Sequence, residues 1–162
     1  AALLVIDVQK GFDDSSWGRR NNPAMEERVA ELLDAWRSSR RPILHARHMS
    51  TLPGSPLRPG QSGNDFKGDA TPRPGEPVIE KRARGAFDGT LLAERLEDLG
   101  VDAVVVAGFT SCGSFTSPGD VSSVACCQDT ASRHCAPGPN RLTCPSIVSR
   151  RASVMGWWSG AR

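Results

Sequence analysis

The most constraining feature of the chain is the unbroken apolar run at its start, which extends from Ala2 to Ile6 and ends in Asp7. A run of this length that is rich in branched residues predicts a strand buried on both faces, as in a parallel sheet covered by helices. Asp7 would then lie at the carboxyl end of the strand, the edge of such a sheet where ligands usually bind. A structural alternative stays open, in which Asp7 only caps the turn that follows.

The next segment carries the signals of an amphipathic helix followed by a second strand. Asn22 and Pro23 favour a helix start, with asparagine at the cap and proline at the first helical position. Apolar residues then recur at helical spacing, at Met25, Val29, Leu32, Leu33 and Trp36. We expect the arginine-rich run 37–41 to form the last turn, where the helix dipole favours positive charge, and Pro42 to end the helix. Residues 43–47 predict the second strand, which completes a parallel strand–helix–strand unit.

Residues 51–77 are dense in proline and glycine, which predicts a long surface loop at the rim of a site or over it as a lid. Folding signals resume directly after this loop. Residues 78–80 predict a short third strand with Lys81 at its end, and residues 101–107 predict a fourth, buried strand that leads to a turn at Gly108.

A second helix is expected between the third and fourth strands. Thr90 would cap it and Gly100 would terminate it. Its apolar residues are Leu91, Leu92, Leu96 and Leu99. The alternation of strands and helices predicts an α/β fold, a three-layer α/β/α domain with a parallel, Rossmann-like sheet. At 162 residues the chain is predicted to form a single domain, 1–162.

The composition changes sharply after Ser111. From that point the chain has no lysine or glutamate, and Leu142 is its single leucine. Only residues 121–127 carry a strand pattern, and residues 147–158 carry a weak pattern of a helix or a strand. Residues 112–162 are therefore atypical of the predicted fold, and two explanations stay open. This part is poorly ordered and leaves the sheet incomplete, or it is the out-of-frame product of an ordinary sequence.

Charge and cysteine content exclude several classes of function. A formal net charge of +2 gives no reason to expect a nucleic-acid or membrane partner, and no apolar stretch is long enough for a membrane span, so we expect a cytoplasmic protein. The five cysteines are an odd number without Cys-x-x-Cys spacing, which favours free thiols. His45 and His48 lack a carboxylate at matching spacing, so we predict no metal and no cofactor.

Three chemically reactive residues follow the predicted parallel strands, namely Asp7, Lys81 and Cys112. Converging in one crevice, they would form an acyl-transfer site. Asp7 would accept the thiol proton, Lys81 would favour the thiolate, and Cys112 would attack a carbonyl whose oxyanion is held by backbone N–H groups of the turn after the fourth strand. The structural alternatives are a solvated lysine at a strand end and a cysteine that only fills space in the core.

Four segments of the chain, in order, resemble the motifs of the isochorismatase-like cysteine hydrolases, the superfamily that includes nicotinamidases and N-carbamoylsarcosine amidase. The similar segments are residues 4–12, residues 57–66, residues 74–91 with Lys81 and the run Ala86-Phe87-Asp88-Gly89-Thr90, and residues 104–110. The resemblance covers residues 2–111 and implies a parallel sheet flanked by helices, the triad Asp7–Lys81–Cys112 and a homo-oligomer. It also implies that Gln9 and Phe12 line the substrate pocket. His48, which follows the second strand, is expected to line the pocket with them.

The resemblance implies a hydrolase that cleaves the C–N bond of a small amide or carbamoyl compound through a cysteine thioester. The chain departs from the family at the nucleophile, because Cys112 lies closer to Gly108 than the family's cysteine does to the corresponding glycine. Two alternatives therefore stay open. One is the vinyl ether hydrolysis of isochorismate by family members that use the aspartate without a cysteine, and the other is a catalytically inactive, degraded family member.

Overall fold

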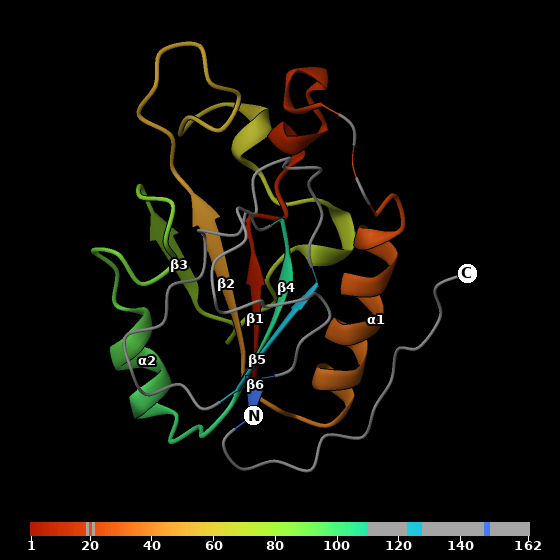
Figure 1. Cartoon of the computed structure of the whole chain (residues 1–162), viewed down its shortest axis with the longest axis vertical. Coiled ribbons are helices and arrows are strands. Elements are labelled where there is room, and N and C mark those ends of the chain that lie inside the picture. Colours follow the sequence, from red (N-terminus) through yellow and green to blue (C-terminus); the bar gives the residue numbers. More distant parts are fainter. Residues whose placement is uncertain (19, 21, 110–122, 128–147, 150–162) are drawn as a thin grey trace, which may run out of the picture.

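A six-stranded sheet forms the centre of the protein (Figure 1). The computed structural model describes residues 1–18, 20, 22–109, 123–127 and 148–149, the last two segments as backbone alone. The strands are β1 (Ala2–Ile6), β2 (Ile43–His48), β3 (Val78–Lys81), β4 (Val104–Gly108), β5 (Ser123–Cys127) and β6 (Val148–Ser149). They lie in the order β3-β2-β1-β4-β5-β6, and all neighbouring pairs are parallel except β5 with β6. The predicted parallel sheet is thus confirmed, with the opening strand at its centre.

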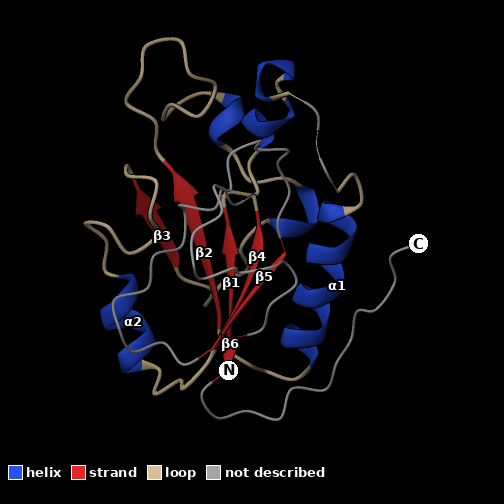
Figure 2. Ribbon diagram, viewed as in Figure 1, coloured by secondary structure: helices blue, strands red, loops and turns tan. Residues whose placement is uncertain are grey.

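One helix covers each face of the sheet (Figure 2), and the alternation of side chains along β1 explains why. Leu3 and Val5 pack with residues of α1 (Met25–Ser38), whereas Leu4 and Ile6 pack with residues of α2 (Leu92–Asp98). All five residues of β1 are buried. The three-layer α/β/α arrangement predicted from the buried apolar run is therefore present in the described part of the chain.

The ends of α1 differ from the prediction. The helix begins at Met25 rather than at Pro23, because the Asn22 side chain accepts a hydrogen bond from the Ala24 N–H at 3.2 Å and closes a separate turn first. It ends at Ser38, so of the arginines at 37–41 only the first lies in the helix. Arg40 has φ +52°, a left-handed conformation that stops the helix before Pro42.

The second helix and the fourth strand are shorter than predicted. Thr90 accepts a hydrogen bond from the Leu92 N–H at 3.3 Å, but α2 begins only at Leu92. Of the four leucines assigned to this helix, Leu92 and Leu96 are buried, whereas Leu91 and Leu99 lie just outside α2 and are 55% and 43% exposed. The predicted strand at 101–107 is observed as β4 from Val104 to Gly108. Gly100 has φ +58°, which agrees with its predicted role at the end of the helix.

The first part of the proline- and glycine-rich loop 51–77 rises above the carboxyl ends of the strands (gold to yellow in Figure 1), and the olive part then runs back beside α1 to the start of β3. It contains two short 3₁₀ turns, η3 (Ser62–Asn64) and η4 (Gly68–Ala70). Leu57 within it is only 2% exposed, so this loop is packed and not merely a surface connection. None of the helices in the described residues is long and apolar enough to cross a bilayer.

Candidate active site

Asp7 lies at the first position after β1, in a conformation that L-residues rarely adopt. Its φ is +57°, in the left-handed region, and its carbonyl accepts a hydrogen bond from the Gln9 N–H at 2.8 Å. The Asp7 N–H still donates to the carbonyl of Ala46 on β2 at 2.9 Å, so the backbone turns sharply while it remains attached to the sheet. Strained conformations of this kind cluster at functional sites.

Asp7 and Lys81 form a buried ion pair. The Lys81 Nζ lies 2.8 Å from Asp7 Oδ2, and the two side chains are 2% and 7% exposed respectively. Lys81 is the last residue of β3, and its Nζ also donates to the carbonyl of Arg84 at 3.2 Å. The other carboxylate oxygen, Asp7 Oδ1, is buried and has no hydrogen-bond partner among the described residues. A buried acceptor without a partner is costly, which points to a ligand or reacting group at this oxygen.

The environment of Asp7 shifts the pKa of its carboxyl toward neutral pH. Burial raises the pKa of the Asp7 carboxyl from 3.8 to about 6, although the charge of Lys81 and its hydrogen bond lower it in part. The carboxylate is therefore ionised at pH 7 but gains a proton readily. This combination suits a group that takes up and returns a proton during a reaction.

Gly108, at the end of β4, makes the close approach of β1 and β4 beside Asp7 possible. It pairs with Ile6 in the sheet and has φ +126°. A Cβ at this position would lie 2.1 Å from the carbonyl oxygen of Ile6, so no other residue fits without displacement of a strand. The Phe109 N–H then donates to the same carbonyl at 2.9 Å. The glycine predicted to open a turn is thus required by packing as well.

The structure brings His48 and Phe12 to the same edge of the sheet. His48 pairs with Lys81 between β2 and β3 and is partly exposed. Burial lowers the pKa of His48, and the charge of Lys81 lowers it further, so the imidazole is neutral at pH 7. Phe12 stacks on Phe109 with ring centroids 5.0 Å apart and an interplanar angle of 13°. Both positions agree with the predicted pocket wall, and their contact with substrate stays a prediction.

Gln9, the third residue predicted to line the pocket, forms hydrogen bonds to backbone groups of two other segments, and its contact with substrate stays a prediction. Its side chain is fully buried, and both hydrogens of its amide are used. Nε2 donates to the carbonyls of His48 at 3.1 Å and Asn64 at 2.9 Å, and Oε1 accepts from the His48 N–H at 2.8 Å. Among the described residues Gln9 therefore holds backbone segments together.

The third member of the predicted triad, Cys112, lies outside the described residues. Its predicted role depends on its sequence position shortly after β4, the neighbour of β1 in the sheet. The described part of the chain brings Asp7 and Lys81 together, as the parallel strand order predicts.

A second buried charge cluster was not predicted from the sequence. Glu76 binds the Arg37 guanidinium through both oxygens, at 2.8 and 2.9 Å, and accepts from His45 Nε2 at 2.9 Å. Burial opposes ionisation of Glu76, but the hydrogen bonds of Arg37, the Arg73 N–H and His45 lower its pKa to about 2. Burial lowers the pKa of His45, although Glu76 raises it in part. The cluster fixes the end of loop 51–77 to α1 and β2.

His45 and His48 belong to different environments and do not converge on a metal. They are an odd number of residues apart on β2, which places their side chains on opposite faces of the sheet. Within the described ranges, no group of three or more His, Cys, Asp or Glu side chains is arranged to hold a metal ion.

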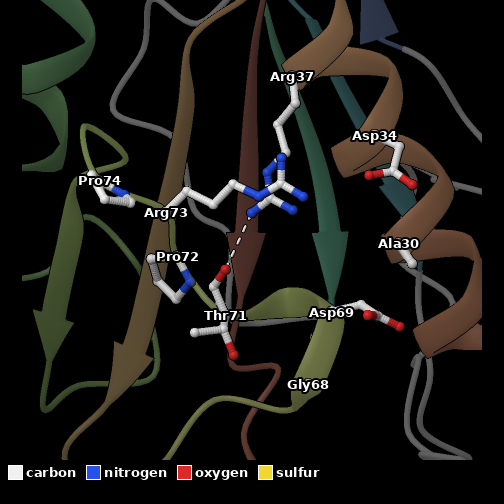
Figure 3. A pocket seen from close by; sticks show the side chains of 9 residues that line it. All are labelled: Ala30, Asp34, Arg37, Gly68, Asp69, Thr71, Pro72, Arg73 and Pro74. Atoms are coloured by element: carbon white, nitrogen blue, oxygen red, sulfur yellow. Dashed lines mark hydrogen bonds between the residues drawn. The ribbon is translucent and has the colours of Figure 1, made fainter.

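A hollow of about 470 Å³ lies between α1 and the loop around η4 (Figure 3). Asp34, Arg37, Asp69 and Arg73 bring charges of both signs to its wall, and the Arg37 Nη2 donates to the carbonyl of Thr71 at 3.2 Å. The remaining lining residues are Ala30, Gly68, Pro72 and Pro74. Neither Asp7 nor Lys81 is among its described lining residues, so the hollow is separate from the Asp7–Lys81 pair.

Comparison with known proteins supports the interpretation of this sheet edge. The family profile of the isochorismatase domain matches residues 1–117. The chain is 36% identical over 110 residues to the uncharacterized isochorismatase family protein YrdC of Bacillus subtilis, an alignment that covers 68% of this chain and 59% of YrdC. It is 30% identical over 146 residues to Nicotinamidase 3 of Arabidopsis thaliana, which covers 81% of this chain and 64% of the relative.

A solved structure agrees with the sequence comparison. A protein described as a hydrolase of the isochorismatase family from Chromobacterium violaceum superposes with a TM-score of 0.63 at 50% sequence identity, over 66% of this chain and 55% of that protein. The matched part of the chain thus spans less than two thirds of the length of these relatives. Asp7, Lys81 and Gly108 all lie within the residues that the family profile matches.

Proposed function

Because the chain belongs to the isochorismatase family, we propose that it is a hydrolase that cleaves the C–N bond of a small amide or carbamoyl compound. The observation that carries the proposal is the buried Asp7–Lys81 pair, in which Asp7 Oδ1 has no partner among the described residues. An ionised acceptor held this way is suited to take a proton from a nucleophile that approaches it.

The proposed reaction uses Cys112 as the nucleophile and Asp7 as the base. Asp7 takes the thiol proton, and the thiolate attacks the carbonyl carbon to give a tetrahedral intermediate. Backbone N–H groups of the turn after β4 would hold its oxyanion. Asp7 then gives the proton to the nitrogen, the amine or ammonia leaves, and an acyl thioester remains. Water attacks the thioester with Asp7 as base, which releases the acid and restores the thiol.

Lys81 serves two purposes in this proposal. Its charge stabilises the thiolate, since a nearby cation lowers the pKa of a cysteine. Its ion pair with Asp7 also keeps the buried carboxyl sufficiently acidic to be ionised at pH 7, against the effect of burial. Without this cation the pKa of the Asp7 carboxyl would be higher, and the carboxyl would be ionised, and so able to act as a base, in a smaller fraction of molecules.

A second candidate function is favoured by the raised pKa of Asp7, which is about 6. Hydrolysis of a vinyl ether begins with proton transfer to carbon, and a carboxyl with this acidity is a better donor near neutral pH than an ordinary aspartate. This reaction needs no cysteine. The close spacing of Cys112 to Gly108 is compatible with it. The third possibility is an inactive protein that retains the fold of the first 109 residues.

Thiol labelling tests the proposed triad directly. We expect iodoacetamide to modify Cys112 faster at pH 7 than the other four thiols, and Asp7→Asn to slow that reaction by at least about tenfold because the base is removed. The exposed pair of Lys10 and Asp65, at 3.1 Å, supplies a matched control, and Asp65→Asn should leave the rate unchanged. Equal, slow labelling of all five thiols would contradict the cysteine mechanism.

Activity measurements separate the three candidate functions. Ammonia release from a panel of small amides and N-carbamoyl compounds should be lost in Cys112→Ala and reduced at least about a hundredfold in Asp7→Asn. Turnover of a vinyl ether that survives Cys112→Ala but not Asp7→Asn would support the second candidate. No turnover with either class of compound would favour the inactive protein. The small-molecule substrate, the homo-oligomer and the cytoplasmic location stay predictions.

A further inference from the structure

Two buried amide side chains next to the candidate site have no role in the proposed reaction. Gln9 is fully buried and Asn64 is 5% exposed, and they come from segments that are far apart in the sequence. Gln9 follows the turn at Asp7, and Asn64 ends η3 in loop 51–77. Both side chains bind the backbone of one residue, His48 at the end of β2.

We propose that Gln9 and Asn64 form an amide clasp that holds His48 in place beside the Asp7–Lys81 pair, and that both are positioning residues for substrate recognition. The proposal rests on the proposed function in one respect, namely that His48 lines the substrate pocket. It assigns Gln9 a role that differs from direct contact with substrate.

The hydrogen bonds of the clasp satisfy both backbone groups of His48. The His48 N–H donates to Gln9 Oε1 at 2.8 Å, and its carbonyl accepts from Gln9 Nε2 at 3.1 Å and from Asn64 Nδ2 at 2.9 Å. The Gln9 side chain thus replaces the neighbouring strand at the point where β1 has already turned away. The second hydrogen of Asn64 Nδ2 goes to the Leu57 carbonyl at 2.7 Å, and that of Gln9 Nε2 to the Asn64 carbonyl at 2.9 Å.

Close packing supports the same contact between the two segments. Gly11 and Gly63 lie so close that a Cβ on Gly11 would be 2.9 Å from the Gly63 carbonyl oxygen and 2.8 Å from a methyl group of Leu57. The Lys10 N–H donates to the Asp65 carbonyl at 2.9 Å. The loop is therefore attached to the residues directly after Asp7 and does not behave as an independent lid.

The clasp places a neutral imidazole next to a charged pair. His48 pairs in register with Lys81, and the Met49 N–H donates to the Lys81 carbonyl at 2.8 Å. Because burial and Lys81 keep His48 uncharged at pH 7, it offers the substrate a hydrogen bond without a net charge. This favours recognition of an uncharged polar group, such as an amide or a ring nitrogen, over recognition of a carboxylate.

The test uses Gln9→Met, which keeps the volume of the side chain and removes its three hydrogen bonds, and Asn64→Ala, which removes only two. Gln61→Met is the matched control, because Gln61 is exposed in the same loop. Thermal unfolding establishes that each variant is folded. If Gln9→Met does not fold, the less disruptive Asn64→Ala still tests the proposal.

The readout that needs no activity is the NMR titration of the imidazoles of the chain, of which there are three. We expect the pKa of His48, which burial and the charge of Lys81 lower in the wild type, to rise toward its ordinary value in both clasp variants. The pKa of His45 should stay constant, and Gln61→Met should change neither. An unchanged His48 titration in both folded variants would overturn the proposal, even if the proposed hydrolase activity is absent.

Kinetics provide the second readout once an amide substrate is turned over. We expect the clasp variants to raise KM by about tenfold with kcat changed less than about threefold, because recognition and not proton transfer is disturbed. A loss of kcat at constant KM would mean that the two amides position Asp7 instead, and would refute the role assigned to His48. Failure of the wild-type protein to hydrolyse any amide would overturn the proposed function alone, since the titration does not depend on it.

Discussion

The raised pKa of the buried Asp7 carboxyl should make the free energy of unfolding fall as the pH rises, and Asp7→Asn removes this contribution. The folded-state pKa of about 6 lies above the ordinary value of 3.8. The folded protein therefore binds the Asp7 proton more tightly than the unfolded chain does between these two values. The stability that Asp7 contributes is fully present below pH 3.8 and is lost as the pH rises through about 6.

The size of this effect follows from the two pKa values. At roughly 1.4 kcal/mol per pKa unit, the interval from 3.8 to about 6 corresponds to about 3 kcal/mol. In Asp7→Asn no proton is exchanged at this position. The free energy of unfolding of the variant minus that of the wild type should therefore increase by most of this amount, about 2.4 kcal/mol, between pH 4 and pH 7. Asp7→Asn also leaves the buried Lys81 without its partner and so destabilises the variant, which is why the change of this difference with pH, and not its absolute size, is the test.

Urea unfolding followed by tryptophan fluorescence, repeated at half-unit steps from pH 4 to pH 7, measures this difference. Subtraction of the wild-type values cancels the titration of His45, His48 and Glu76, which both proteins share. Asp65→Asn on the exposed Lys10–Asp65 pair is the control, and its difference from the wild type should vary much less. A difference for Asp7→Asn that is flat, or that falls as the pH rises, would refute the assignment of a desolvated carboxylate.

Two further substitutions test how the site is supported. Gly108→Ala should lower the free energy of unfolding by about 3 kcal/mol or more, because its Cβ would lie 2.1 Å from the Ile6 carbonyl oxygen and φ is +126°. Gly100→Ala is the control, because the space around Gly100 is open, and it should cost about 1 kcal/mol. Equal effects of the two changes in urea unfolding would argue against the close approach of β1 and β4. Glu76→Gln should cost about 1–3 kcal/mol at pH 7, because the Arg37 guanidinium, whose side chain is only 11% exposed, loses its charged partner. The stability that the Glu76 carboxylate contributes is present above pH 4.5 and is lost as the pH falls through about 2. The free energies of unfolding of this variant and the wild type should therefore converge between these two pH values. A constant difference between them would contradict the lowered pKa of Glu76.

Most of the architecture follows from local patterns in the sequence. The apolar run from Ala2 to Ile6 is uniform because β1 is buried on both faces, and this burial fixes its place at the centre of a parallel sheet. The element ends were less predictable, since they depend on single hydrogen bonds. Asn22 closes a turn ahead of α1, and Thr90 bonds to Leu92 without starting α2 at the expected place.

The buried charge cluster and the amide clasp were not predicted, because their residues lie far apart in the sequence and show no regular spacing. The buried cluster joins Arg37 and Glu76, which are 39 positions apart, and His45 and Glu76, which are 31 positions apart. The clasp joins Gln9 to Asn64 across 55 positions. An amide or an ion pair can satisfy almost any polar group, so its partner is decided by the packing of loop 51–77. The density of glycine in that loop was the available signal, because a Cβ on Gly63 would lie 2.3 Å from the carbonyl oxygen of Pro56, so the close packing of the loop on itself requires glycine there.

The sequence alone determined that Asp7 and Lys81 belong to one site. Each residue lies at the end of a parallel strand, and the carboxyl ends of parallel strands meet at one edge of the sheet. Only the tertiary structure decided whether the two charged groups are solvated or buried. Their burial to a few per cent exposure, and the absence of a partner for Asp7 Oδ1 among the described residues, distinguish the pair from a solvated ion pair and underlie the proposed catalytic role. Desolvation depends on every segment that covers a side chain, and the positions of those segments are properties of the whole fold.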